Sequence, residues 1–192
     1  MKKTMKWILA SASPRRKQLL KEIVPEFTVL PAKGEERVEE VPPHLLVQSL
    51  ATQKAEEVAS LPQANDAIVL GADTVVAVDG EVLGKPKDET DAVRMLSMLS
   101  GRKHQVYTGV CIIYPQDGTR KKMVSFAKTD VYFYPLTQEQ IMRYVQTGSP
   151  MDKAGAYGIQ DGNLVERIDG SFSNVVGLPV ELCREMAENL PK

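Results

Sequence analysis

Short apolar runs alternate with amphipathic segments along the 192-residue chain. Runs such as 67–70 have the length and composition of buried strands, whereas 44–59 has the apolar spacing of a helix. We therefore predict strands at 7–10, 27–30, 67–70, 75–78, 105–114 and 124–134, and helices at 14–22, 44–59, 88–99, 137–147 and after Pro179.

Local sequence signals mark the limits of several of these elements. Ser13 and Pro14 form a good N-cap and first-turn pair for the first helix. The run 136–140 has the spacing of a capping box, and Gly148 ends the helix that this box opens. Asp79-Gly80 predicts a hairpin. The glycine-rich segment 148–162 shows no periodicity, so we expect a long loop, which in compact domains is often functional.

The order of these elements predicts an α/β fold, with a mixed, partly antiparallel twisted sheet and flanking helices. With 43% hydrophobic residues, the chain is long enough to bury one sizeable core. We find no internal repeat, low-complexity tract or linker, and we therefore expect residues 1–192 to form a single domain.

Charge and composition limit the classes of partner. The 24 basic and 25 acidic residues nearly cancel, so the chain lacks the basic excess that nonspecific nucleic-acid binding requires. A local basic cluster still allows a small anionic ligand. No apolar run approaches the roughly 20 residues of a membrane span. The run after Lys6 is too short for a signal peptide, so we expect a cytoplasmic protein without membrane or nucleic-acid partners.

Cysteine and histidine positions argue against a disulfide framework and a zinc site. Cys111 and Cys183 lie in separate apolar stretches, which suits buried thiols in a reducing compartment. His44 and His104 have no Cys or His at ligand spacing. The candidate chemistry therefore rests on carboxylates, lysines and a hard divalent metal.

The first candidate site is the segment 11–16, which carries two serines and two arginines. Arg15 and Arg16 fall in the first turn of a helix, where the positive end of the helix dipole makes cations mildly unfavourable. Helix-start N–H groups, the hydroxyls of Ser11 and Ser13, and two guanidiniums together predict a polyanion site, such as one for a triphosphate. A solvated basic face with a Ser-Pro cap is the alternative.

The second candidate is Asp73, which we expect to follow directly after the strand 67–70. Strand ends are where α/β proteins commonly build sites. A carboxylate there can ligate Mg²⁺ or take a proton from water. The alternative is an ordinary turn aspartate that caps the next segment.

Two further segments offer charge and base recognition. Lys85 precedes Pro86, whose restricted backbone can present a fixed positive charge, although an ordinary surface lysine would look the same. In the loop 151–160, small residues allow backbone to approach a ligand. Lys153 there suits phosphate, and the amide of Gln160 can bind the edge of a base. A tight structural loop is the alternative.

Taken together, five segments resemble the Maf family, also called septum formation proteins, over nearly the whole chain. They are Ser11-Ala12-Ser13-Pro14-Arg15-Arg16, Gly71-Ala72-Asp73-Thr74, Gly84-Lys85-Pro86, Asp152 to Gln160, and Val176-Gly177-Leu178-Pro179. The resemblance implies the fold of inosine triphosphate pyrophosphatases. It also implies a nucleoside triphosphate pyrophosphatase that splits the α–β phosphate bond with Mg²⁺ or Mn²⁺, and a tendency to form homodimers.

The same resemblance implies roles for individual residues. Asp73 matches the family's proton acceptor and metal contact, and Glu36 matches a second metal-holding carboxylate. Lys54 and Lys85 match phosphate-facing lysines, whose charge would stabilise the transition state. Arg15, Thr74 and Gln160 match the trio that distinguishes the dTTP/UTP branch from members that prefer 7-methyl-GTP.

After Gln160 the chain departs from the family pattern, because Asp161-Gly162-Asn163 leads directly to Leu164 and shortens the loop. The resemblance further implies clearance of modified pyrimidine triphosphates and a link to cell division arrest. A non-catalytic nucleotide-binding regulator of septum formation is the rival hypothesis. The presence of Glu36, Asp73 and Lys85 together argues against it, because binding alone needs no water-activating carboxylate.

Overall fold

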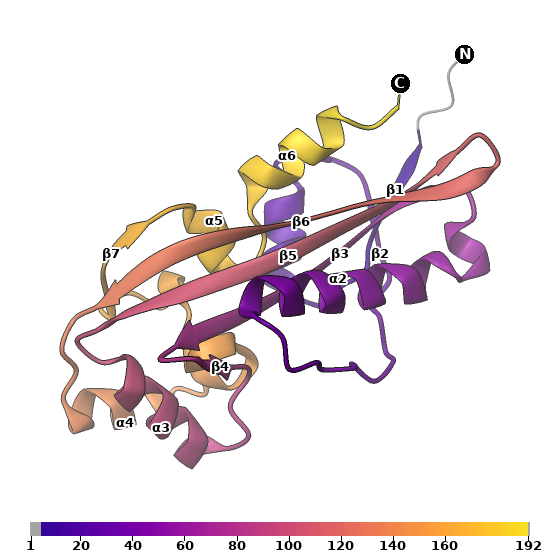
Figure 1. Cartoon of the computed structure of the whole chain (residues 1–192). Coiled ribbons are helices and arrows are strands. Elements are labelled where there is room, and N and C mark those ends of the chain that lie inside the picture. The colour runs from indigo at the N-terminus through magenta and orange to yellow at the C-terminus, as the bar shows by residue number, and fades with distance from the viewer. Residues whose placement is uncertain (1–4, 192) are drawn as a thin grey trace. The chain divides into compact units, whose positions relative to one another are not determined.

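The computed structural model describes residues 5–191, which form two compact units. Unit one comprises the described residues 5–73, 108–127 and 177–191, and unit two comprises residues 74–107 and 128–176. Figure 1 shows the elements in chain order. Three long strands, β3, β5 and β6, contribute residues to both units.

The strands are β1 (Lys6–Leu9), β2 (Thr28–Val29), β3 (Ala67–Val78), β4 (Glu81–Leu83), β5 (Lys103–Gln116), β6 (Thr119–Phe133) and β7 (Val165–Asp169). The α-helices are α1 (Pro14–Leu20), α2 (Pro43–Ala59), α3 (Glu89–Leu99), α4 (Gln138–Gln146), α5 (Phe172–Val176) and α6 (Val180–Glu188). Short 3₁₀ turns are η1 (Pro62–Ala64), η2 (Ser149–Asp152), η3 (Ala154–Ala156) and η4 (Ile159–Asp161). The strands pair in the order β2, β1, β3, β5, β6, β7, with β4 on β3.

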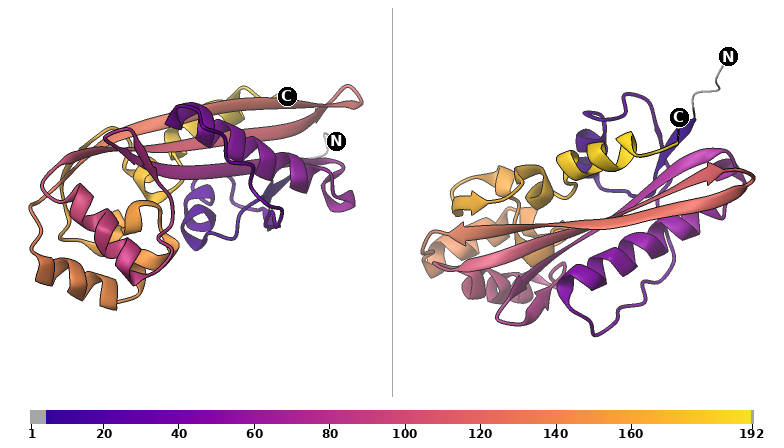
Figure 2. Two further views of the ribbon diagram at one scale, coloured as in Figure 1. Left: turned by 60° about the horizontal axis from the view of Figure 1, so that its bottom comes forward. Right: turned by 45° about the horizontal axis from the view of Figure 1, so that its top comes forward.

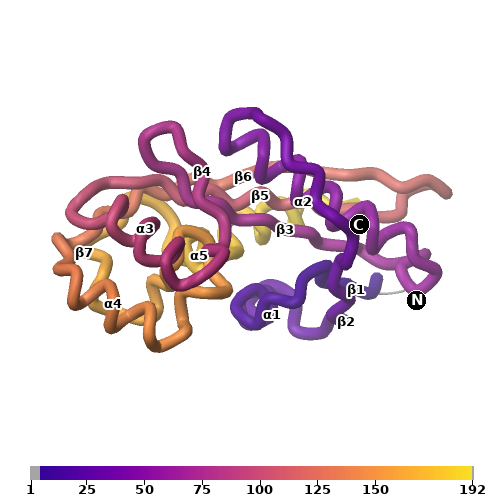
Figure 3. The backbone as a smooth tube through the Cα atoms, turned by 90° about the horizontal axis from the view of Figure 1, so that it is seen from below, coloured from indigo at the N-terminus to yellow at the C-terminus, as the bar shows by residue number. Residues whose placement is uncertain are grey.

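Side chains alternate across the strands of unit one and create two apolar layers. On one face, Ile8, Val69 and Cys111 pack against the buried side of α2. On the other face, Leu9, Ile68 and Ile112 pack with residues of α1 and α6, such as Leu20 and Met186. In Figures 1 and 3, α2 accordingly lies on the opposite side of β3 from α6 and α1.

Two glycines allow α2 to approach the strands of unit one closely. A Cβ atom at Gly71 would lie 2.5 Å from the carbonyl oxygen of Ala51, and one at Gly109 would lie 2.2 Å from that of Val47. These are backbone atoms of α2, which cannot move aside independently. The helix therefore lies where any larger residue at 71 or 109 would displace it.

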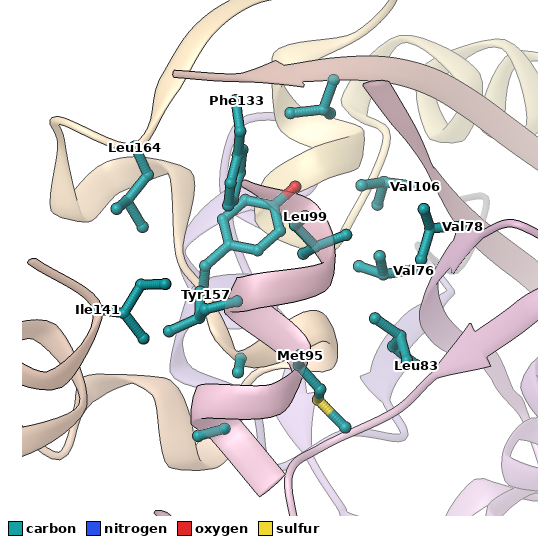
Figure 4. Close-up of a cluster of buried hydrophobic side chains, with 14 of the residues drawn as sticks. Val76, Val78, Leu83, Met95, Leu99, Val106, Phe133, Ile141, Tyr157 and Leu164 are labelled. Carbon is teal, nitrogen blue, oxygen red and sulfur yellow. The ribbon is translucent and has the colours of Figure 1, made fainter. Parts of the chain in front are cut away.

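The core of unit two is built around aromatic rings. Tyr157 and Phe133 have ring centroids 4.7 Å apart in an edge-to-face arrangement, and residues of α3 and β3 surround them (Figure 4). The Tyr157 hydroxyl lies 2.7 Å from Nε2 of the fully buried His104. Burial lowers the pKa of His104 to about 4, which keeps the imidazole neutral at pH 7.

The mixed, partly antiparallel α/β fold predicted from sequence is confirmed. β1 pairs in parallel with β2 and β3, whereas β4 and β7 pair antiparallel with β3 and β6. The predicted caps are also present: Ser13 Oγ accepts the Arg16 amide, and Thr137 and Gln140 form the capping box. Asp79 and Gly80, both with positive φ, form the turn between β3 and β4. Cys111 and Cys183 are buried free thiols, as expected.

Three expectations about local structure were wrong. The segments 67–70 and 75–78, expected as two strands, are one continuous strand, so 71–74 lies within it. Gly71 is required there by the approach of α2, not by chain reversal. β7 and α5 were not among the expected elements, and the segment 148–162 contains three 3₁₀ turns rather than irregular loop alone.

Within residues 5–191, no helix combines the length and apolarity that a membrane crossing requires.

Candidate active site

The loop between β1 and α1 is organised by its two serines. Ser11, which is 8% exposed, accepts a hydrogen bond from the backbone N–H of Ser13 at 3.2 Å. Ser13 in turn caps α1 by accepting the Arg16 amide at 3.3 Å. The segment predicted to bind a polyanion is thus a capped helix start, and Arg15 and Arg16 fall in the first turn of α1.

Arg16 links this loop to the segment that precedes α6. Its Nε donates to the carbonyl oxygen of Gly177 at 2.8 Å, and its Nη1 lies 3.5 Å from Ser11 Oγ. Burial lowers the pKa of Arg16 from its usual value, while the negative charge of Asp73 acts in the opposite direction. Asp73 thus interacts electrostatically with the Arg16 guanidinium.

Asp73 lies in the interior of β3 and is 9% exposed. Because side chains alternate, Asp73 shares the strand face of Val69 and Gly71, which is the face that α2 covers. There the ammonium of Lys54, from α2, contacts Asp73 Oδ1. The exposed carboxylate of Glu36, from the loop before α2, lies 2.9 Å from the same ammonium.

Lys54 therefore bridges two carboxylates that are far apart in sequence. Oxygen atoms of Glu36 and Asp73 both lie within contact distance of one cationic centre, which is the arrangement that a divalent cation needs from a pair of acidic ligands. No group of three or more His, Cys, Asp or Glu side chains within residues 5–191 could hold a metal. The donor set suits Mg²⁺, which binds one or two carboxylates and completes its shell with water and phosphate oxygens.

The remaining predicted site residues belong to unit two. Thr74 directly follows Asp73 in β3 and is half-buried. Lys85 is exposed in the turn before α3, and its neighbour Pro86 is buried. The carbonyl oxygen of Gly84 accepts the Gly155 amide at 3.0 Å, which joins this turn to the segment that carries Gln160. Gln160 is exposed in η4.

Lys153 is held by its own loop. Its ammonium donates to the Ser149 carbonyl oxygen at 2.6 Å and to Asp152 Oδ1 at 2.9 Å. Asp161 also fastens this loop, because it accepts hydrogen bonds from the hydroxyls of Tyr144 at 2.5 Å and Ser149 at 2.6 Å. These contacts hold the Lys153 ammonium within its own loop, and its predicted role in phosphate binding stays a prediction.

In the structure, Lys54 thus contacts both Glu36 and Asp73. Arg16 is close enough to Asp73 for the negative charge of Asp73 to act on its guanidinium. Sequence reasoning did not identify the carbonyl of Gly177 as the acceptor for Arg16, although it noted the motif that contains this glycine. It also did not identify Gln53 and Glu57, whose side chains bind backbone of the loop that carries Glu36. No local signal marks a side chain that binds backbone many residues away.

Similarity to known proteins shows the fold and the family of this chain. The fold is similar to that of the Staphylococcus aureus Ham1 protein, with a TM-score of 0.53 and 19% identity over 95% of this chain and 98% of that chain. The model of the family described as "Maf-like protein" matches residues 6–190, and the chain belongs to this family.

Two relatives with the same name match nearly the whole chain. A protein named dTTP/UTP pyrophosphatase from Agathobacter rectalis is 53% identical over 187 residues, which cover 90% of this chain and 91% of that protein. A protein of the same name from Carboxydothermus hydrogenoformans is 48% identical over 187 residues, covering 96% of this chain and 98% of that protein.

Proposed function

We propose that this protein is a metal-dependent nucleoside triphosphate pyrophosphatase that hydrolyses dTTP and UTP, together with modified pyrimidine triphosphates. The products are a nucleoside monophosphate and pyrophosphate. The observation that carries the proposal is the contact of Lys54 with both Glu36 and Asp73 on the α2 face of β3. The names of the Agathobacter and Carboxydothermus relatives support the choice of substrates.

Asp73 is the proton acceptor in this proposal. Its carboxylate is largely buried, and it accepts from Lys54 while remaining close enough to Arg16 to influence that guanidinium. A water molecule that attacks phosphorus would lose its proton to an Asp73 oxygen as the bond to the pyrophosphate leaving group breaks. The charges of Lys54 and Lys85 would stabilise the negative charge that develops on the phosphate oxygens.

Glu36 and Asp73 would hold the divalent cation, Mg²⁺ or Mn²⁺. When bound, such an ion supplies Lewis-acid polarisation of a phosphoryl oxygen. Ser11, Ser13 and Arg16 would bind phosphate at the start of α1, where N–H groups and guanidinium favour anions. Arg15, Thr74 and Gln160 would select the base, and Lys153, whose ammonium is held near Ser149, would contribute a positive charge for phosphate.

The test is a panel of standard and modified nucleoside triphosphates with Mg²⁺, in which pyrophosphate and orthophosphate are measured separately. We expect pyrophosphate as the first product, with dTTP and UTP turned over faster than purine triphosphates. Orthophosphate as the first product would contradict the proposal. Tight nucleotide binding without any product would favour the rival hypothesis of a non-catalytic regulator of septum formation.

We further propose a cytoplasmic location, which the free and buried Cys111 and Cys183 support. Residues 1–192 would act as one functional domain, since a single family model matches residues 6–190. A homodimer, implied by the family resemblance, can be tested by light scattering of the purified chain.

A further inference from the structure

The loop that carries Glu36 is fastened to α2 by a side chain of that helix. The carboxylate of Glu57 accepts the backbone amide of Lys33 at 2.7 Å through Oε1 and the amide of Gly34 at 3.0 Å through Oε2. A carboxylate that receives two N–H donors, one on each oxygen, makes charge-assisted bonds with a fixed geometry. Glu57 thus holds the chain two residues before Glu36.

A second side chain of α2 holds the chain on the other side of Glu36. The Oε1 of Gln53 accepts the backbone amide of Arg37 at 2.9 Å, and its Nε2 donates to the carbonyl oxygen of Arg37 at 3.0 Å. The same Nε2 lies 3.2 Å from Ser49 Oγ, one turn earlier on the helix. The amide group of Gln53 therefore binds both backbone groups of the residue that follows Glu36.

The loop residue that contacts Glu57 Oε2 is a glycine. A Cβ atom at Gly34 would lie 2.8 Å from Oε2 of Glu57, closer than real Cβ atoms approach an oxygen. A larger residue there would push the carboxylate away from the two amides. The glycine at 34 thus lets the Glu57 carboxylate approach the loop backbone closely without being displaced.

Both fastening residues belong to the helix that supplies Lys54. Gln53 precedes Lys54 and Glu57 lies three residues after it, so one rigid element holds the loop and also contacts Glu36 and Asp73. Figure 2 shows the loop after β2 running beside α2 in both views. The helix is itself fixed against the strands by the close approaches at Gly71 and Gly109.

From these contacts we infer that Gln53 and Glu57 are positioning residues for Glu36. They act through the backbone on both sides of Glu36 and hold its carboxylate over Lys54, at a fixed place relative to Asp73. Their side chains contact loop backbone rather than reacting groups. The expected effect on metal affinity rests on the proposed function, because that function makes Glu36 a metal ligand. Outer partners of metal ligands typically alter metal affinity 10–100-fold when removed.

The first measurement is amide hydrogen exchange in the full-length protein, which needs no substrate. In Glu57→Ala the amides of Lys33 and Gly34 should exchange about tenfold faster, the factor that corresponds to loss of a hydrogen bond to a charged acceptor. In Gln53→Ala the amide of Arg37 should respond in the same way. Matched controls are Glu56→Ala, whose carboxylate pairs with Lys122, and Gln48→Ala, whose amide bonds to His44 within α2.

The second measurement is the affinity for Mn²⁺, read by electron paramagnetic resonance. Gln53→Ala and Glu57→Ala should each weaken Mn²⁺ binding about tenfold, as should Glu36→Gln, whereas both control variants should match the wild type. The double variant Glu36→Gln with Glu57→Ala should bind no more weakly than Glu36→Gln alone, because Glu57 acts through Glu36.

Unchanged exchange at residues 33, 34 and 37 would overturn the inference, because the contacts would then not hold the loop. Faster exchange with unchanged Mn²⁺ affinity would also overturn it, since the loop would be held without positioning Glu36. So would additive losses in the double variant. Failure of the proposed function is a separate result. A wild-type protein that binds Mn²⁺ but releases no pyrophosphate would disprove the proposed enzymatic activity. The roles of Gln53 and Glu57 would still be supported by the amide exchange and the Mn²⁺ affinity of the variants.

Discussion

The ammonium of Lys54 lies 2.9 Å from Oε1 of Glu36 and also contacts Asp73, so this lysine is the centre of the acidic pair. Replacing it with an unbranched apolar residue, Lys54→Met, removes the ammonium and its positive charge while keeping most of the length of the side chain. We expect turnover to fall by about 10²–10³, the scale seen when one stabilising group for transition-state charge is lost. Steady-state pyrophosphate release measures this effect.

Lys122→Met is the matched control for Lys54→Met. Lys122 is an exposed lysine of unit one that pairs with Glu56 at 2.7 Å. Its replacement should leave turnover unchanged. Equal losses of turnover in both variants would show that Lys54 contributes only to the overall charge of the protein and not to a specific contact with Glu36 and Asp73.

Asp73→Asn keeps the shape of the side chain but removes its ability to accept a proton at neutral pH. Turnover should fall by at least about 10²-fold with nucleotide binding largely retained, as expected when a general base is lost. Asp117→Asn, in the turn between β5 and β6 where φ is +50°, is a suitable control because asparagine tolerates that conformation. Activity of Asp73→Asn close to wild type would remove Asp73 from the mechanism.

Arg15→Ala tests base selection. Arg15 is half-buried in the first turn of α1. Its loss should raise KM for dTTP and UTP or change the order of preferred bases, with a smaller effect on kcat. Lys17→Ala, an exposed cation of the same helix, should leave the preference intact. A kinetic profile identical to wild type across the substrate panel would count against a role for Arg15.

Gly71→Ala tests whether the approach of α2 to β3 positions Lys54. The new methyl group would lie 2.5 Å from the Ala51 carbonyl oxygen and 2.8 Å from the Ala55 amide nitrogen. We expect a loss of about 1–3 kcal/mol in the free energy of unfolding, because overpacking moves backbone. Turnover should fall as well, since Lys54 moves with its helix.

Denaturant unfolding measures the stability of Gly71→Ala. At Gly84 an added Cβ meets no atom within 4 Å, so Gly84→Ala should change stability by no more than about 0.5 kcal/mol. Equal stability of the two variants would show that α2 adjusts without strain.

The buried His104 predicts a pH dependence of stability. Its pKa in the folded protein is about 4, below the unfolded value of 6.5, because burial disfavours the charged ring. The unfolded chain therefore takes up the proton first as pH falls. This pKa difference contributes about 3 kcal/mol to the free energy of unfolding. The contribution is fully present above pH 6.5 and is lost progressively as the pH falls toward 4.

The variant His104→Gln isolates this contribution. The free energy of unfolding should fall less steeply in the variant than in the wild type between pH 6.5 and pH 4, since glutamine does not titrate. Parallel pH profiles of the two proteins would mean that His104 takes up its proton equally in the folded and unfolded states.

Features that depend on neighbouring residues could be predicted from the sequence. The cap at Ser13, the capping box of Thr137 and Gln140, and the turn at Asp79-Gly80 all form from contacts within a few residues. The resemblance to the Maf family implied that Asp73, Glu36 and Lys54 act at one site, and in the structure Lys54 contacts both carboxylates.

The tertiary structure alone decided how those residues are held. Gly71-Ala72-Asp73-Thr74 has the composition of a turn, yet it is strand, because Gly71 is needed where α2 crosses β3. The strand β7 has no fully buried residue, so its pairing with β6 left no periodic signal. Gln53 and Glu57 look like ordinary surface residues of an amphipathic helix. Their function depends on backbone some 16 to 24 residues away, and such long-range partners become visible only when the chain is folded.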